Sequence, residues 1–206
     1  MLSRWRKASI MIWLALAAQL SAPIPKEGWL HPADFPSRLM SVNAYAQLLL
    51  RVTVDPNGII QSCGVEEPSE SQMEARVDAY TCDLTLKRAS FLPARGADGK
   101  VTYGVYRLPV VWEMTPYVRK SFPDLTLQVN KLPSGIKSPA MIELDFAADP
   151  DGTLSSCEAK DQHQNGALAR IGCDQLQKQF KAFAPKTPAG ASTSSIQNAF
   201  VEFRAK

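Results

Sequence analysis

The sequence contains only two histidines, and its four cysteines lie far apart, at Cys63, Cys82, Cys157 and Cys173. No cysteine pair has the C-x-x-C spacing of a thioredoxin-type redox site or a zinc site, and neither histidine lies at ligand spacing from a cysteine. The chain also lacks a G-x-S-x-G motif, so no serine nucleophile stands out. These absences favour a protein that is not an enzyme and that binds no metal ion and no cofactor.

An excess of basic residues is also absent outside the N-terminus. Of the 23 Lys and Arg residues, Arg4, Arg6 and Lys7 lie in the first 22 positions, which hold no acid, and the remaining 20 are balanced by 20 Asp and Glu. Binding to a phosphate backbone requires a concentrated basic face. The even balance therefore excludes nucleic acid as an expected partner.

The N-terminal residues 1–22 have the pattern of a signal peptide or a short N-terminal anchor. The basic residues precede an apolar run at 9–18, which is shorter than the roughly 20 residues that a membrane-spanning helix needs. Small residues at Ala15 and Ala17, and again at Ser21 and Ala22, offer cleavage sites, and Pro23 is a poor first residue for a mature chain. We expect export, with membrane contact at most through this segment and with the cleavage site open.

The rest of the chain contains an internal repeat. The segment 50–63 resembles the segment 144–157, and five residues of the first recur 94 positions later in the second. The recurring residues are Asp55, Pro56, Gly58, Ser62 and Cys63, matched by Asp149, Pro150, Gly152, Ser156 and Cys157. In both copies an apolar stretch leads into Asp-Pro-x-Gly, which is a typical turn between two strands.

A helix and a closing strand follow the hairpin in each copy. Met73, Val77, Tyr80 and Leu84 have helical spacing, and alternating residues from Tyr106 to Met114 indicate a half-buried strand. The sequence thus predicts an α+β fold of two tandem β-β-α-β units, each a small antiparallel sheet packed on one helix. The units span 34–114 and 140–206, with a Pro-containing linker at 115–139.

The cysteines fall at matching places in the two units, at the end of the second strand and within the helix. Cys63 with Cys82 and Cys157 with Cys173 would each join helix to sheet within one unit, although a bond between units is the competing connectivity. Either pairing indicates an oxidising compartment.

The first unit resembles the C-terminal domain of TonB-type energy transducers. The resemblance rests on the order of Asp34-Phe35-Pro36, the run 50–58, Cys63, Cys82, the run 88–95 and Trp112. The cysteines suggest a duplicated, alphaproteobacterial-type variant, and the second unit at 140–206 is a degenerate copy.

The resemblance implies a periplasmic protein-interaction module, linked to TonB-dependent transmembrane transport. An extended segment of an envelope or outer-membrane transporter protein would add as a strand along the closing strand, from Tyr103 to Met114. The residues expected at this peptide-binding edge are Tyr103, Val105, Arg107, Val111 and Glu113.

Two alternatives remain open at this point. In one, the chain is a structural envelope protein whose two units pair edge to edge and leave no peptide edge open. In the other, from a different class, the cysteines make it a periplasmic thiol oxidoreductase. Titration of free thiols separates the two, because a catalyst has a reducible and reactive pair.

Overall fold

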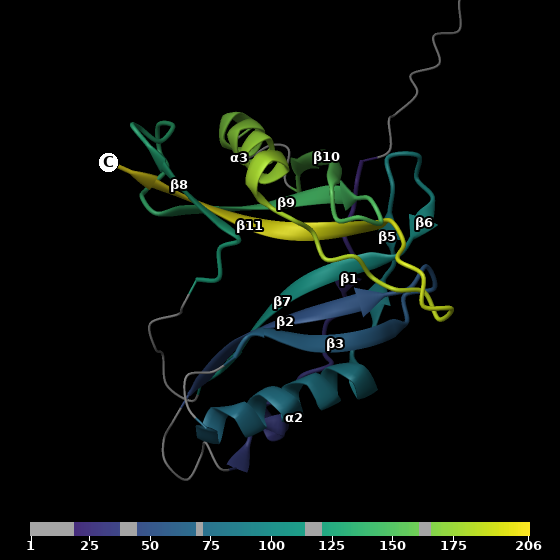
Figure 1. Cartoon of the computed structure of the whole chain (residues 1–206). Helices are drawn as coiled ribbons and strands as arrows, with labels where there is room; N and C mark the ends of the chain where they lie inside the picture. Colours follow the sequence, from purple (N-terminus) through teal and green to yellow (C-terminus); the bar gives the residue numbers. More distant parts are fainter. Residues whose placement is uncertain (1–18, 38–44, 69–71, 114–120, 161–165) are drawn as a thin grey trace, which may run out of the picture.

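The computed structural model describes residues 19–37, 45–68, 72–113, 121–160 and 166–206 (Figure 1). Residues 1–18 of the predicted export segment lie outside these ranges. Residues 19–22 lie within them and belong to the folded part of the protein.

The first unit is a three-stranded antiparallel sheet with one helix. Its main elements are β2 (Ala46–Val54), β3 (Ile60–Glu67), α2 (Gln72–Arg88) and β7 (Gly104–Trp112). In the β2–β3 turn, Asp55 Oδ1 accepts hydrogen bonds from the N–H groups of Asn57 and Ile59, and Gly58 has φ of 81°. A Cβ on Gly58 would clash with the carbonyl oxygen of Phe91. Only glycine fits this turn without strain.

The second unit repeats the same order. Its elements are β9 (Ala140–Ala148), β10 (Leu154–Ala159), α3 (Gly166–Gln179) and β11 (Ser195–Ala205). Gly152, the repeat counterpart of Gly58, has φ of 85° in the β9–β10 turn. The structure therefore confirms the predicted α+β class, with hairpin, helix and closing strand in each unit.

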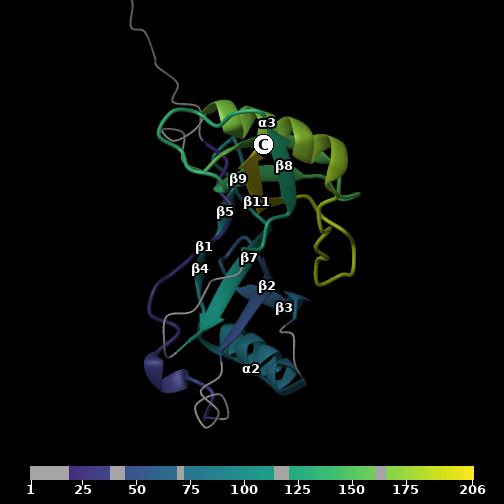
Figure 2. The ribbon, with the colours of Figure 1, turned by 90° about the vertical axis from the view of Figure 1, so that its left-hand side faces the viewer.

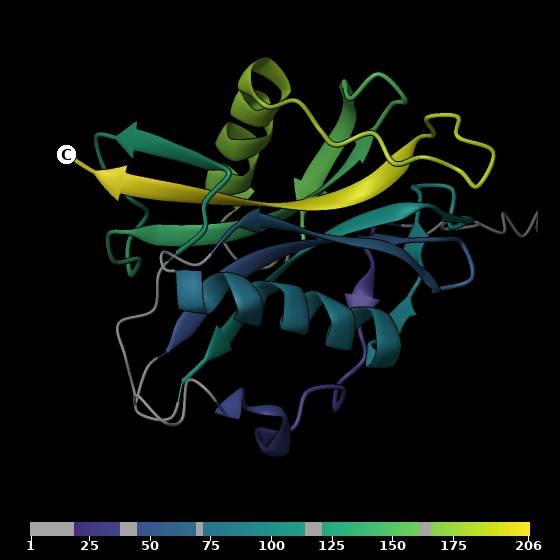
Figure 3. The ribbon, with the colours of Figure 1, turned by 60° about the horizontal axis from the view of Figure 1, so that its bottom comes forward.

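The two units share one seven-stranded sheet instead of forming separate sheets. Six of its strands follow the order β10-β9-β11-β7-β2-β3, and the seventh, β8, pairs with β11. The two closing strands, β7 and β11, run parallel to each other, and every other neighbouring pair in this order is antiparallel. Helices α2 and α3 lie on opposite faces of this sheet, one over each end (Figures 1 and 3). This arrangement is that of two similar units related by an approximate two-fold axis along the central strands.

The predicted linker 115–139 contains a strand. Within the described part of this segment, β8 (Leu125–Val129) pairs in parallel with the second half of β11, on the side where β7 pairs with the first half. The interpretation as a simple linker is therefore incomplete. Figure 2 shows β8 beside β11 at the end away from β2 and β3. Two smaller sheets complete the fold: β1 (Ile24–Pro25) with β4 (Phe91–Leu92), and β5 (Ala94–Arg95) with β6 (Val101–Thr102).

Each helix covers its own hydrophobic core. Val77 and Leu84 of α2 are buried as predicted, whereas Tyr80 is 37% exposed. Thr81 and Thr85 take the expected place of Tyr80 on the buried face, because their hydroxyls donate to the carbonyls four residues earlier, at 2.7 and 2.8 Å. The Trp112 indole N–H donates to Thr81 Oγ1 at 2.8 Å.

Both disulfides join a helix to a strand within one unit. Cys63 in β3 is bonded to Cys82 in α2, and Cys157 in β10 is bonded to Cys173 in α3. The structure thus selects the pairing within units over the bond between units. The disulfides indicate an oxidising compartment outside the cytoplasm.

Candidate binding edge and the junction between units

The first half of the predicted peptide-binding edge is already paired with the second unit. β11 aligns Ile196 with Gly104 and Gln197 with Val105, and the N–H of Ile196 donates to the carbonyl of Tyr103 at 3.0 Å. The Val105 side chain is buried. The prediction that Tyr103 and Val105 face a peptide partner is therefore wrong, because a strand of the same chain occupies their edge.

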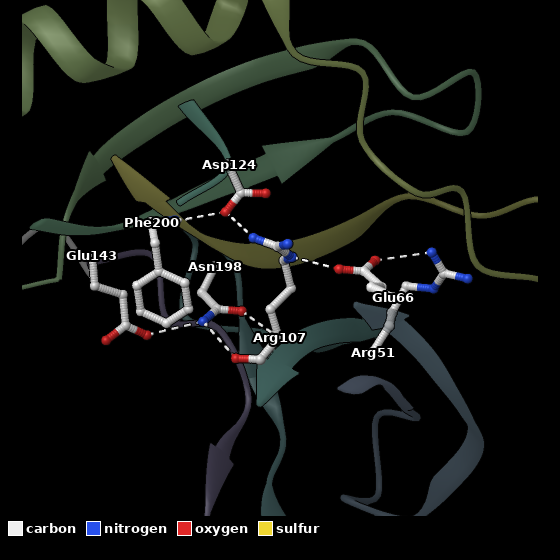
Figure 4. Close-up of polar contacts among 7 residues, drawn as sticks. All are labelled: Arg51, Glu66, Arg107, Asp124, Glu143, Asn198 and Phe200. Carbon is white, nitrogen blue, oxygen red and sulfur yellow. Dashed lines mark hydrogen bonds and ion pairs between the residues drawn. The ribbon is translucent and has the colours of Figure 1, made fainter. Parts of the chain in front are cut away.

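At Arg107 the backbone of β7 bonds to the side chain of Asn198 and not to the backbone of β11. The Arg107 N–H donates to Asn198 Oδ1 at 2.7 Å, and Asn198 Nδ2 donates back to the Arg107 carbonyl at 3.3 Å (Figure 4). The same amide nitrogen donates to Glu143 Oε1 at 3.1 Å. Asn198 is buried, so its amide satisfies backbone groups that would otherwise lack partners.

The Arg107 side chain belongs to an ion cluster between the units and does not point outward as predicted. Its Nε donates to Glu66 Oε2 at 2.6 Å, its Nη1 contacts Asp124 Oδ2, and the side chain is 13% exposed. Glu66 also accepts from Arg51 Nη1 at 2.9 Å (Figure 4). The Arg51 guanidinium lies 4.0 Å from the centre of the Phe183 ring, which comes from the second unit. Breaking such a buried pair on one side is costly, because it leaves an uncompensated charge.

Asp124 connects this cluster to β11. Its Oδ2 accepts the N–H of Phe200 at 2.8 Å, and its own N–H donates to the Phe200 carbonyl at 2.7 Å. Burial raises the pKa of Asp124 to about 6, while Arg107 and the Phe200 N–H act in the opposite direction. The bonds of Asp124 to Phe200 hold the start of β8 against β11.

Val111 and Glu113 lie beyond the junction. Val111 pairs with Gln47 of β2 and is partly buried, and Glu113 follows the last residue of β7. Pro109 contributes no N–H to the outer side of β7, and in the described ranges no strand pairs with that side from Pro109 to Trp112. Among the described residues of the predicted edge, β11 leaves this short part uncovered, and Met114, the last residue of that edge, lies outside the described residues.

The two ends of the sheet present longer edges. β3 has eight residues and β10 has six, and each pairs with one strand among the described residues. At the end of β10 the carbonyl of Ala159 already accepts a hydrogen bond from Gln19 Nε2 at 3.1 Å. β3 is thus the longest strand of the main sheet with one side uncovered in the described structure.

Two grooves lie beside the helices. One, of about 470 Å³, is lined by Phe35, Pro36, Val77 and Tyr80 among others, and the second, of about 480 Å³, lies where Cys157 and Cys173 join β10 to α3. Across the described ranges, no group of three or more His, Cys, Asp or Glu residues is placed to hold a metal ion. In the same part of the chain, no helix is long and apolar enough to cross a membrane.

Sequence reasoning identifies Arg107 but misses its partners. Asn198, Asp124 and Glu66 come from three different segments, and only the sheet brings them together. One signal exists for Asn198, because it interrupts the apolar residues of a predicted strand between Ile196 and Phe200. Comparison with known protein families, curated proteins and solved structures gives no match for this chain.

Proposed function

We propose that this protein is a non-catalytic protein-interaction module, exported to the periplasm, that takes up an extended segment of another envelope protein at the outer edge of β3. The observation that carries the proposal is the strand order, in which β3 ends the sheet and has β2 as its one neighbour within the described ranges. An unpaired edge offers a row of backbone donors and acceptors to another chain.

The backbone groups available at this edge follow from the register. Arg51 is opposite Gly64 and Thr53 is opposite Ser62, while the Arg107 backbone faces away from β2 toward Asn198. The register of β3 shifts at Gln61 and again at Glu66. Between these two shifts N–H and C=O groups alternate between the two sides of the strand, so those of Cys63 and Val65 point away from the sheet. The bond from Cys63 to Cys82 fixes the middle of this edge.

One exposed apolar side chain lies just before the start of β3. Ile59, in the β2–β3 turn, is 59% exposed. This side chain would favour an apolar residue at the neighbouring end of an added strand.

The partner class comes from the family that the first unit resembles. In that family an extended segment of an envelope or outer-membrane transporter protein adds to the closing strand. Here β11 takes that place on β7, so the receiving edge moves to β3. The interaction would rest on a few backbone hydrogen bonds, and we expect an affinity near micromolar, about −8 kcal/mol.

The experiment begins with a photo-crosslinking residue at Gln61, with its repeat counterpart Ser155 as the control, in protein held in its native compartment. A synthetic peptide from the crosslinked segment is then titrated into labelled protein while amide chemical shifts are recorded. We expect shifts at Gln61, Cys63 and Val65. Val65→Pro, which removes an outward N–H, should weaken binding at least tenfold, whereas Ala159→Pro in β10 should not. Shifts confined to other strands would contradict the β3 site.

A second candidate is the structural envelope protein. The observation that favours it is the junction itself, because β11 and Asn198 close the first half of the edge that the family would use. A purely structural protein would show no crosslinked partner at Gln61 and no amide shifts with any peptide.

The thiol oxidoreductase has weaker support. Both disulfides are separated widely in sequence, by 19 and 16 residues, and each joins a helix to its own sheet. An oxidoreductase would carry a disulfide that exchanges readily with a dithiol substrate, so a test of dithiol turnover decides this point.

A further inference from the structure

We propose that the export signal is cut between Ala17 and Ala18, so that residues 19–25 stay in the mature protein as a strap that joins the two units. The inference rests on the proposed export but not on the β3 edge. The sequence leaves the cleavage site open, and the residues just after the apolar run make contacts with both units.

The strap pairs with the first unit through its backbone. The Ser21 N–H donates to the carbonyl of Arg95 at 3.0 Å, and the Arg95 N–H donates to the carbonyl of Ser21 at 2.9 Å. Further along, β1 pairs with β4. Between these two contacts Pro23 packs directly on Gly104, so closely that a Cβ on Gly104 would clash with the proline ring.

The strap also donates to carboxylates of the second unit. The Ala22 N–H donates to Asp145 Oδ2 at 3.1 Å in a buried bond, and the Leu20 N–H contacts Glu158 Oε1. Alternate N–H groups of one short segment therefore bond to different units, those of Leu20 and Ala22 to the second and that of Ser21 to the first.

The side chains of the strap belong to the core of the first unit. Leu20 is 6% exposed and Ala22 is 1% exposed, and both pack in the cluster under α2 together with Ile196 of β11. Burial of this kind stabilises a protein, because it removes apolar surface from water. The protein would lose both side chains if the chain were cut after Ala22.

The two possible cuts leave different chains. A cut after Ala22 removes residues 20–22, takes the Ala22 N–H away from the buried Asp145, and begins the mature chain with Pro23. A cut after Ala17 uses Ala15 and Ala17 as the small residues before the cleaved bond, in the A-x-A pattern, and leaves every strap contact in place. Of the two cuts, the second keeps all the described contacts of the strap, and the first loses those of residues 20–22.

The first test is the mass and N-terminal sequence of the protein isolated from its native compartment. We expect the mature chain to begin at Ala18. A chain that begins at Pro23 or later, or that keeps residues 1–17, would overturn the inference. Ala17→Arg should block the cut and leave the full-length chain, whereas Leu16→Gln, one position earlier, should be processed normally. Processing of both variants at the same rate would also overturn it.

The second test measures the strap independently of processing. Ser21→Pro removes the N–H that bonds to Arg95, and Ser21→Ala keeps it. In the chain that begins at Ala18, we expect Ser21→Pro to lower Tm by about 5 °C and Ser21→Ala to change it by less than about 2 °C. Equal Tm values for the two variants would overturn the strap. Neither test measures peptide binding, so the β3 edge and the strap can fail separately.

Discussion

At the scale of single residues, the junction between the units depends on side chains that replace a strand. Where β11 and β7 separate after two aligned pairs, Asn198 continues the hydrogen bonding to Arg107 with its amide. Beside it, the Arg107 side chain is held between Glu66 and Asp124. A buried polar network of this kind specifies one arrangement strongly, because each group left without a partner costs about 1–3 kcal/mol.

Asn198→Ala should therefore destabilise the protein by about 2 kcal/mol, since it removes the partner of the Arg107 N–H in a buried site. Chemical denaturation measures this loss. The matched control is the same substitution at an exposed asparagine, Asn130→Ala just after β8, which should change stability by less than about 0.5 kcal/mol. Equal effects of the two variants would show that the amide bonds contribute little.

Asp145 should make stability depend on pH. Burial raises its pKa to about 6 from the usual 3.8, with the Ala22 N–H and Lys160 acting in the opposite direction and Glu143 and Glu158 adding to the rise. Because the pKa in the folded state is higher than in the unfolded state, the folded chain holds this proton more tightly. The resulting stabilisation is full below about pH 4 and is lost as the pH rises through about 6.

The measurement compares Asp145→Asn with the natural chain across this range. The natural protein should lose about 2–3 kcal/mol relative to the variant between about pH 4 and pH 7. The variant keeps the shape of the side chain and an acceptor for the Ala22 N–H, so the comparison isolates the titration. Parallel pH curves for the two proteins would contradict the prediction.

At the scale of elements, each helix is fastened to its sheet by one disulfide. The bond at Cys63 closes a separation of 19 residues and the bond at Cys157 closes one of 16. The entropy of closing loops of these lengths in the unfolded chain corresponds to about 3 kcal/mol each. The two helices therefore depend on their cysteines to a similar degree.

Replacing Cys63 and Cys82 together by Ser should cost about 3 kcal/mol, and so should replacing Cys157 and Cys173 together. Denaturation of the two double variants, with the natural chain under the same conditions, gives both values. A far smaller loss in one of them would mean that packing alone holds that helix in place. Mass spectrometry after alkylation confirms that the remaining disulfide is formed in each variant.

At the scale of the whole molecule, the sequence predicts what is local and misses what joins the units. The hairpins, the helices and the disulfides follow from Asp-Pro-x-Gly turns, helical spacing and repeat-matched cysteines. The β7–β11 pairing involves only two aligned residue pairs, Gly104 with Ile196 and Val105 with Gln197, which lie far apart in the chain, so no local pattern encodes it. Sequence reasoning therefore places the free edge where the second unit in fact lies. It misses β8 because Pro123, Pro133 and Pro139 surround that strand and suggest a linker.

The first unit alone should associate with itself. A chain of residues 18–113 leaves the edge from Tyr103 to Arg107 without β11, and an uncovered edge pairs with another strand. We expect dimers with a dissociation constant near micromolar in sedimentation experiments, about −8 kcal/mol. The natural chain, in which β11 and Asn198 cover the edge from Tyr103 to Arg107, should not associate through this edge at the same concentration, and a first unit that stays monomeric would contradict the prediction.

The register across the junction brings equivalent positions of the two repeats together. Arg51 pairs with Arg107 and Asp145 pairs with Asn198, and Asp145 is the repeat counterpart of Arg51. Arg107 and Asn198, which bond to each other, are therefore the same position in the two copies. Where two identical subunits pair across a two-fold axis, such a position meets its own copy, so both sides carry the same residue. Within one chain the two copies are free to differ, and here one carries a guanidinium and the other carries the amide that binds its backbone.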